Sequence, residues 1–395
     1  MIHISKMASA VQPSATLAAG ARAKQMKAQG IHVFDFSLGE PDFNTPEHIR
    51  AAALEAMNKG QTHYTAANGT PELRGAVARY YEKNYSLKVH PDQVLISNGA
   101  KHSIHNVLAA LVGPGDEVII PTPYWVSYSD LVQMTGASYV LVPTTLESGF
   151  KMSPAQFRAA ITPRTRLVML NSPSNPTGSV YTREELLALA DVALERKIAV
   201  LSDEIYEKLV FGDAKGTCFA TLRPGLEELT LTISGVSKTY AMTGWRIGWA
   251  VGPQHVIKAM GNVQSQETSC ACSVSQAAAV AALDGDQTCV EEMRREFQAR
   301  RDLVCDRLKK IPGVRSFVPD GAFYAFFDIS AHLGRTLGGK PVSDSMSFCM
   351  AALDTAHVNL VPGAAFGAEG FVRLSYATSR EILQGGLDRL EKFLQ

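Results

Sequence analysis

One lysine in this sequence lies among small and hydroxyl residues directly after an apolar run. Residues 229–233 form that run, Ser237 and Lys238 follow it, and Arg246 comes eight positions after the lysine. A lysine held where a strand ends can form a Schiff base with an aldehyde, and the serine and arginine can hold a phosphate carried by that aldehyde. A surface lysine before a turn has the same short pattern, so the pattern needs support from the rest of the chain.

A carboxylate ends another apolar run. Asp203 follows residues 198–201 and comes 35 residues before Lys238. A partly buried carboxylate is costly unless a cation pairs with it, and a protonated ring nitrogen is a suitable partner. Tyr206, three residues later, could donate a hydrogen bond to an oxygen on the same ring. Alone this would be an ordinary strand end, but its spacing from Lys238 favours a functional interpretation.

Small residues open a predicted helix at residues 102–111. Gly99, Ala100 and Lys101 follow the predicted strand 93–97, and a helix start of this kind leaves backbone N–H groups free for a phosphate. The signal is weak by itself. Lys101 could be an exposed lysine of the first helical turn, but a cation is unfavourable at that end of the helix dipole, which favours a role in ligand binding.

Three further side chains are candidates for binding. Trp125 follows the predicted strand 117–120 and could either stack on an aromatic ring or pack in the core. Asn175 lies in a polar loop, residues 171–178, after another strand. Arg373 lies in an apolar strand, residues 371–376, where a guanidinium needs an anion. That anion could be a carboxylate ligand or the partner in a structural salt bridge.

The elements that must position these residues alternate along the chain. Short apolar runs at 94–97, 117–120, 138–142, 167–170, 198–201, 229–233 and 247–251 are interspersed with helical segments such as 183–196. This alternation predicts an α/β fold with a mostly parallel sheet covered by helices, whose ligands collect at the carboxyl ends of the strands. We expect an N-terminal arm at 1–45 that joins the smaller domain, a large domain at 46–285, and a smaller α+β domain at 286–395.

Composition excludes several functional classes. The 395 residues include 38 basic and 38 acidic side chains, so the net charge is zero, which argues against an electrostatic nucleic-acid or membrane binder. No apolar run is long enough to span a bilayer, and residues 1–30 lack the apolar core of a signal peptide. The six cysteines form no C-x-x-C pair and are expected to be plain thiols. We expect a cytoplasmic protein without bound metal.

The segments around these candidates resemble, nearly end to end, those of class I pyridoxal-phosphate-dependent aminotransferases of fold type I. The resemblance covers residues 39–43, 123–128, 171–178 and 234–248. It implies that Lys238 carries pyridoxal phosphate and moves the substrate's Cα proton, and that Arg373 binds the substrate α-carboxylate. The residues implied to bind the cofactor are Gly99, Ala100, Lys101, Trp125, Asn175, Asp203, Tyr206, Ser237, Arg246 and, from the neighbouring subunit, Tyr64. Gly39, Trp125 and Asn175 are also implied to contact the substrate.

The resemblance is strongest to bacterial aspartate aminotransferases of the aspartate/prephenate subgroup. Ser14, Thr16 and Lys101 are similar to the set with which these enzymes bind a distal carboxylate, which implies aspartate and 2-oxoglutarate as substrates in a ping-pong reaction. Gln12 replaces a lysine of prephenate-using members, and Gly235 replaces a phosphate-binding serine of other relatives.

The resemblance also implies a homodimer with shared active sites, since Tyr64 would serve the neighbouring subunit. An aromatic, prephenate or kynurenine aminotransferase is the alternative within the family. A non-catalytic effector-binding domain of a transcription regulator is a remote alternative. Such proteins carry an added DNA-binding domain and usually a basic region, whereas this chain is neutral overall.

Overall fold

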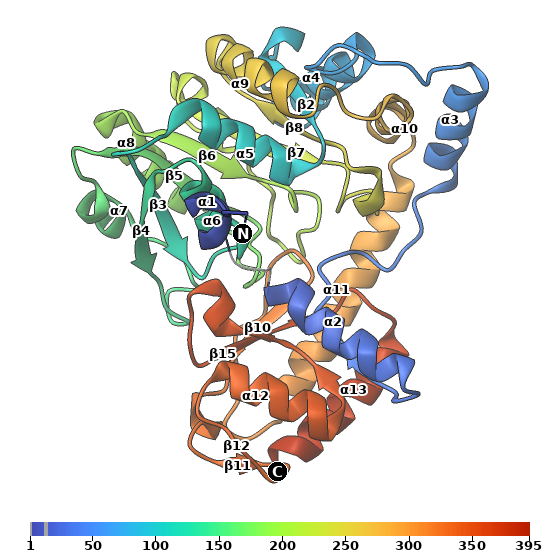
Figure 1. The fold of residues 1–395 in the computed structure, drawn as a ribbon, viewed down its shortest axis with the longest axis vertical. Coiled ribbons are helices and arrows are strands. Elements are labelled where there is room, and N and C mark those ends of the chain that lie inside the picture. The colour runs from blue at the N-terminus through green and yellow to red at the C-terminus, as the bar shows by residue number, and fades with distance from the viewer. Residues whose placement is uncertain (1, 12–14) are drawn as a thin grey trace.

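The computed structural model describes residues 2–11 and 15–395, without the side chains of residues 6, 10 and 15–19. Its centre is a seven-stranded sheet, seen in the upper part of Figure 1. From edge to edge the strands are β2 (Val94–Ser97), β8 (Gly248–Val251), β7 (Thr230–Gly235), β6 (Ala199–Asp203), β5 (Thr165–Asn171), β3 (Glu117–Thr122) and β4 (Ser138–Pro143). Only β8 runs antiparallel to its neighbours in this sheet, so the predicted mostly parallel sheet is confirmed.

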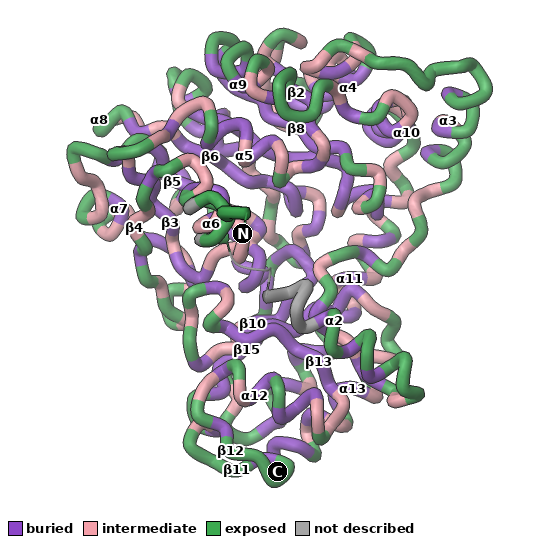
Figure 2. The backbone as a smooth tube through the Cα atoms, viewed as in Figure 1, coloured by how far each residue is buried: buried purple, intermediate pink, exposed green. Residues whose placement is uncertain are grey.

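Helices cover both faces of this sheet, because successive side chains of a strand point to opposite faces. Ile120 of β3 packs in a buried cluster with side chains of α5 (Ala100–Leu111) and α9 (Gln254–Glu267), whereas its neighbour Ile119 packs in another cluster with side chains of α8 (Arg183–Arg196). Figure 2 shows the resulting buried strands between partly exposed helices. The helices of this part are α3 (Glu47–Asn58), α4 (Pro71–Tyr85), α5 (Ala100–Leu111), α6 (Ser127–Met134), α7 (Pro154–Ala160), α8 (Arg183–Arg196), α9 (Gln254–Glu267) and α10 (Ser273–Asp284).

The C-terminal part packs around a smaller antiparallel sheet, seen in the lower part of Figure 1. Its strand order is β14 (Val361–Pro362), β15 (Phe371–Ser375), β10 (Tyr324–Asp328) and β9 (Arg315–Ser316). Helices α11 (Thr288–Leu308), α12 (Ser345–Ala351) and α13 (Arg380–Leu394) surround it, with the short pair β11 (Thr336–Leu337) and β12 (Lys340–Pro341). In Figure 1, α11 runs from the upper part into the lower part.

The N-terminal segment contributes to both parts. Helix α1 (Lys6–Ala10) comes first, and α2 (Ala15–Ala28) lies beside the C-terminal part, where it contacts β14. Strand β1 (Phe34–Asp35) pairs in parallel with β13 (Val358–Asn359). The chain then returns to the large sheet through residues 39–45, so this segment joins the two parts.

Candidate functional site

A cavity of about 280 Å³ lies at the carboxyl ends of the central strands. The predicted residues that line it are Gly39, Ala100, Lys101, Trp125, Asn175, Asp203, Tyr206, Ser237, Lys238, Arg246 and Arg373. They come from segments far apart in the sequence. Asn175, Asp203 and Lys238 meet because β5, β6 and β7 run in parallel and end at the same edge, whereas Arg373 comes from β15 of the C-terminal part. The candidates that were predicted at the carboxyl edge of the sheet therefore line one cavity.

Lys238 supplies the amine of this cavity. It follows β7 by three residues, and its Nζ donates a hydrogen bond to the Gly39 carbonyl oxygen at 2.5 Å. Burial lowers the pKa of Lys238 to about 8, because the surrounding protein disfavours the ammonium form. A much larger share of this lysine is therefore a neutral amine near neutral pH than of an exposed lysine, and the neutral amine is the nucleophilic and basic form.

Asp203 supplies a buried carboxylate at the end of β6. Tyr128 Oη donates a hydrogen bond to its Oδ2 at 2.6 Å, and the Ile205 backbone N–H donates to its Oδ1 at 3.3 Å. Burial raises the pKa of Asp203 to about 6, although both hydrogen bonds oppose the rise. Within the part of the chain that the structure describes, no cation forms an ion pair with this carboxylate. A bound group with a protonated nitrogen would therefore be stabilised here.

The start of α5 meets a guanidinium group. A Cβ atom at Gly99, where φ is +86°, would lie 2.3 Å from Arg246 Nη2, so only glycine permits this approach. Arg246 Nη1 donates to the Thr243 carbonyl oxygen at 2.8 Å. Ser237 lines the same cavity. The N-terminal backbone of the helix, a guanidinium and a hydroxyl together are suited to a phosphate group.

Arg373 lies in β15 and is buried at 1% exposure. Its Nη1 donates to Asn175 Oδ1 at 3.0 Å, and its Nη2 donates to the Ser37 carbonyl oxygen at 2.7 Å. Its guanidinium carbon lies 4.6 Å from the ring centre of Tyr324 and 5.1 Å from that of Phe366. Among the described residues no carboxylate forms a salt bridge with this arginine, and its Nε has no hydrogen-bond partner, so the structural salt-bridge alternative is wrong.

Lys101 and Trp125 lie together at the side of the cavity. The Lys101 Nζ is 5.0 Å from the centre of the Trp125 ring, and Trp125 is half-buried while it lines the cavity. Burial and the nearby charge of Arg246 lower the pKa of Lys101. Trp125 is therefore more than a core residue, and Lys101, although exposed, lines the cavity with its ammonium group beside the Trp125 ring.

Five other residues of the sequence analysis either are not fully described or do not line this cavity. Ser14 and Gln12 lie outside the described residues, and so does the side chain of Thr16. Tyr64 is 92% exposed and does not line the cavity, so its predicted role in a neighbouring subunit stays a prediction. Gly235 lies where a Cβ atom would be 2.8 Å from the Ile247 carbonyl oxygen, so a serine would not fit without a shift.

Two tyrosines of the site escaped the sequence analysis. Tyr128 lies three residues after Trp125, and this helical spacing close to a cavity residue was the available signal. Tyr324 Oη lies 2.8 Å from Tyr206 Oη, and Tyr324 also stacks against Arg373. No local signal marks Tyr324, because only the pairing of β10 with β15 brings it to the site.

Comparison with known proteins identifies the family. The model of the family "Aminotransferase class I and II" matches residues 31–390. The chain belongs to this aminotransferase family. It is 47% identical to the aspartate/prephenate aminotransferase of Cereibacter sphaeroides and 45% identical to the aspartate aminotransferase of Geobacillus stearothermophilus, over 100% of this chain and 99% of each relative. The crystal structure of the aspartate aminotransferase from Rhizobium meliloti superimposes with a TM-score of 0.96 at 45% identity, covering 100% of this aminotransferase and 99% of that chain.

The amine, guanidinium and carboxylate groups of the cavity suit an organic phosphate. Among the described residues, no group of three or more histidine, cysteine, aspartate or glutamate side chains could hold a metal. The described helices also include none that is long and apolar enough to cross a membrane. The residues of the cavity fit an aromatic aldehyde that carries a phosphate and a ring nitrogen. Lys238 offers an amine for the aldehyde, Arg246 and the start of α5 offer donors for the phosphate, and Asp203 offers a buried carboxylate for the ring nitrogen.

Proposed function

We propose that this aminotransferase transfers the amino group of L-aspartate to 2-oxoglutarate with pyridoxal phosphate as its cofactor. The observation that carries the proposal is the meeting of Lys238, Asp203 and Arg373 in one cavity. These residues supply an amine of lowered pKa, a buried carboxylate and a buried guanidinium; among the described residues, the last two have no partner of opposite charge in an ion pair.

The residues of the cavity would hold the cofactor by its different parts. Ser237, Arg246 and the start of α5 would bind the phosphate, and Asp203 would pair with the protonated ring nitrogen. Asn175 and Tyr206 would bond to the ring oxygen, and Trp125 would lie against the ring. When bound, the cofactor supplies a carbonyl that exchanges between lysine and substrate amino groups, and a ring that takes up the electron pair freed at Cα.

The chain's own groups would perform the proton transfers. Lys238, once its amine is free, takes the proton from the substrate Cα as a general base and returns a proton as a general acid. Its pKa of about 8 suits both tasks, because each protonation state is accessible near neutral pH. Arg373 would hold the α-carboxylate with two parallel hydrogen bonds, so the Cα–H bond stays within reach of the lysine. The second half-reaction would run the same steps in reverse with a 2-oxo acid, in a ping-pong cycle.

The preference for aspartate rests on the side of the cavity that holds Lys101. Its ammonium group would bind the distal carboxylate of the substrate, together with the hydroxyls of Ser14 and Thr16. Relatives named aspartate aminotransferase support this choice, and a similar structure, with a TM-score of 0.94 at 40% identity over both full chains, is that of the Thermus thermophilus enzyme with maleate, a four-carbon dicarboxylate.

We also propose that the enzyme works as a homodimer in the cytoplasm. Tyr64 is 92% exposed, as expected of a side chain that completes the site of a partner copy. All six cysteines are free, which suits a reducing compartment.

The decisive experiment follows the absorbance of the holoenzyme while single amino acids are added without a 2-oxo acid. Aspartate is expected to move the visible cofactor band into the near ultraviolet, and phenylalanine is expected to do so far less effectively. Conversion by phenylalanine alone would keep the chemistry and reject the substrate. A Lys238→Ala variant that folds and still transaminates near the wild-type rate would reject the mechanism.

A further inference from the structure

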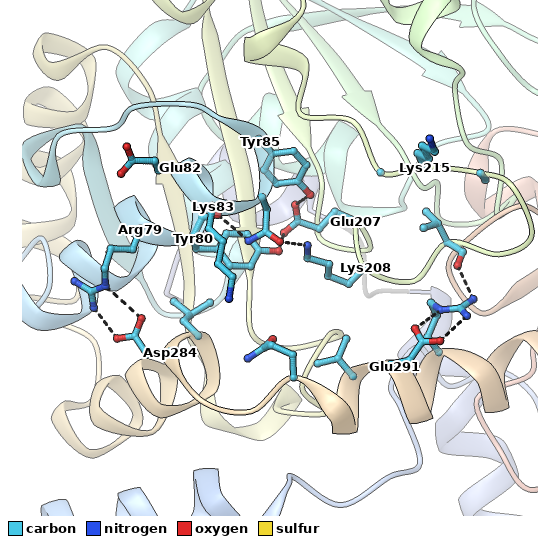
Figure 3. A pocket seen from close by; sticks show the side chains of 18 residues that line it. Arg79, Tyr80, Glu82, Lys83, Tyr85, Glu207, Lys208, Lys215, Asp284 and Glu291 are labelled. Atoms are coloured by element: carbon cyan, nitrogen blue, oxygen red, sulfur yellow. Dashed lines mark hydrogen bonds and ion pairs between the residues drawn. The ribbon is translucent and has the colours of Figure 1, made fainter.

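A second cavity of the described chain is separate from the aminotransferase site. It has a volume of about 930 Å³ and lies between the end of α4, the segment 207–216 after β6, and the junction of α10 with α11 (Figure 3). The end of β6 divides the two cavities, because Asp203 and Tyr206 line the first while Glu207 and Lys208 line the second. A ligand in this second cavity would therefore not compete with the cofactor.

Carboxylates and arginines of this cavity already have partners. Glu207 accepts hydrogen bonds from Tyr80, Tyr85 and Ser234. Arg79 pairs with Asp284 through its Nη2 at 2.6 Å. At the far end, the Arg294 guanidinium forms two bonds with the Glu291 carboxylate, at 2.7 and 2.9 Å. These groups hold the walls together and leave little charge free for a ligand.

Two lysines of the cavity are different. Lys83 and Lys208 both line the cavity and form no ion pair with any described residue; in Figure 3 the Lys208 amine is hydrogen-bonded to a neighbouring side chain of α4. The charge of Lys83 is close enough to oppose protonation of Lys208, whereas the nearby Glu207 carboxylate favours it more strongly. That carboxylate already accepts hydrogen bonds from three hydroxyl groups, so it is only partly available to the two lysines. Two ammonium groups that repel each other are stabilised by a shared anion.

Lys208 is also held in place before any ligand arrives. Its Nζ donates to Asn84 Oδ1 at 2.6 Å and lies over two aromatic rings, 5.2 Å from the centre of Tyr80 and 5.6 Å from that of Tyr85. An immobilised amine loses less conformational entropy on binding than a mobile surface lysine does. The geometry therefore makes Lys208 an anchor rather than a solvated surface charge.

We propose that this cavity binds a phosphorylated small molecule, with the phosphoryl group between Lys83 and Lys208. Lysine acts as a point charge that suits a phosphate with several equivalent oxygens, whereas a planar carboxylate is better matched by arginine. The apolar side chains of Val210, Leu283 and Val290 line the same cavity and offer a surface for the organic part. The volume suits a metabolite-sized ligand.

The test measures binding of two probes, inorganic phosphate and glycerol 3-phosphate, to the holoenzyme by isothermal titration calorimetry. Absorbance of the bound cofactor verifies that it stays in its own site throughout. We expect one binding event per chain in the wild type, and an affinity at least about tenfold lower in Lys83→Gln and in Lys208→Gln. The matched control is Lys88→Gln, which removes an exposed lysine just beyond α4 that does not line the cavity.

The two probes distinguish the possible sources of the phosphoryl group. Tighter binding of glycerol 3-phosphate shows that the organic part uses the apolar wall, and equal binding shows that phosphate alone is the ligand. Either result supports the proposed site if Lys83→Gln and Lys208→Gln both lower the affinity for the probe and Lys88→Gln does not. Absence of binding of both probes to the wild type, or equal loss in all three variants, overturns the proposal. Thermal unfolding of each variant verifies that it is folded.

Discussion

Replacing Tyr128 with phenylalanine should raise the pKa of Asp203. Tyr128 is buried, and its Oη donates to Asp203 Oδ2 at 2.6 Å. The hydroxyl stabilises the ionised carboxylate more than the neutral acid, so its loss favours protonation. The phenylalanine ring retains the apolar part of the side chain, including its edge contact with Trp125 at 5.5 Å. The change therefore removes one hydrogen bond with little change in packing.

The size of the effect follows from the energy of that hydrogen bond. A hydrogen bond to a charged group contributes about 1.5–3 kcal/mol, and one pKa unit corresponds to about 1.4 kcal/mol. The neutral acid keeps part of the interaction, so the lower end of this range is appropriate. The pKa of Asp203, about 6 in the wild type, should rise by about one unit. At pH 7 the ionised share would fall from about nine tenths to about half.

The assay is a ¹³C NMR titration of cofactor-free protein labelled at the aspartate side-chain carboxyl groups. The Asp203 signal is assigned by its loss in Asp203→Asn. Tyr139→Phe is the matched control, because Tyr139 bonds to Gln133 and not to Asp203. An unchanged or lower pKa of Asp203 in Tyr128→Phe would refute the reasoning. The same variant should also bind pyridoxal phosphate more weakly, because fewer molecules present a carboxylate to the ring nitrogen.

Three further predictions concern other parts of the site. Gly99→Ala should lower the free energy of unfolding by about 1–3 kcal/mol and weaken phosphate binding, because φ is positive there and the new Cβ would lie 2.3 Å from the Arg246 guanidinium. The control is Gly113→Ala, whose new Cβ would have no atom within 4 Å. Equal effects of the two substitutions in thermal unfolding would contradict this account. In cofactor-free protein, acetylation of Lys238 by acetic anhydride should rise with a midpoint near pH 8, because burial disfavours the ammonium form, and a midpoint near the ordinary 10.5 contradicts it. Arg373→Lys should raise the KM for aspartate roughly a hundredfold, because one ammonium cannot replace two parallel bonds, and an unchanged KM in steady-state kinetics rejects the clamp.

Local sequence patterns were sufficient to predict the elements of the central sheet. Helix 183–196 and strand 94–97 have the predicted bounds, because the helix has a clear hydrophobic period between its start and stop signals and the strand is a short apolar run. The C-terminal part was less predictable. The short strands β11 to β14 have two residues each, which is too short for a periodic signal. Helix α12 is α-helical over Ser345–Ala351 and continues as a π-helix to Ala356, a change that no hydrophobic period indicates.

The sequence alone determined which side chains could do chemistry and at which edge of the sheet they would meet. Lys238 and Asp203 each follow a parallel strand, and the carboxyl ends of such strands must share one edge, so their convergence follows from the order of elements along the chain. Their protonation does not follow from that order. The pKa values of about 8 and about 6 come from burial by many residues that are distant in sequence.

Tertiary structure alone decided the contacts between the two parts of the chain. Arg373 reaches Asn175 and Ser37 only because the C-terminal sheet packs against the carboxyl edge of the central sheet. The pair Lys83 and Lys208 likewise forms only where α4 meets the segment after β6. Such contacts depend on the relative placement of separately formed elements, and no local pattern of residue types encodes that placement.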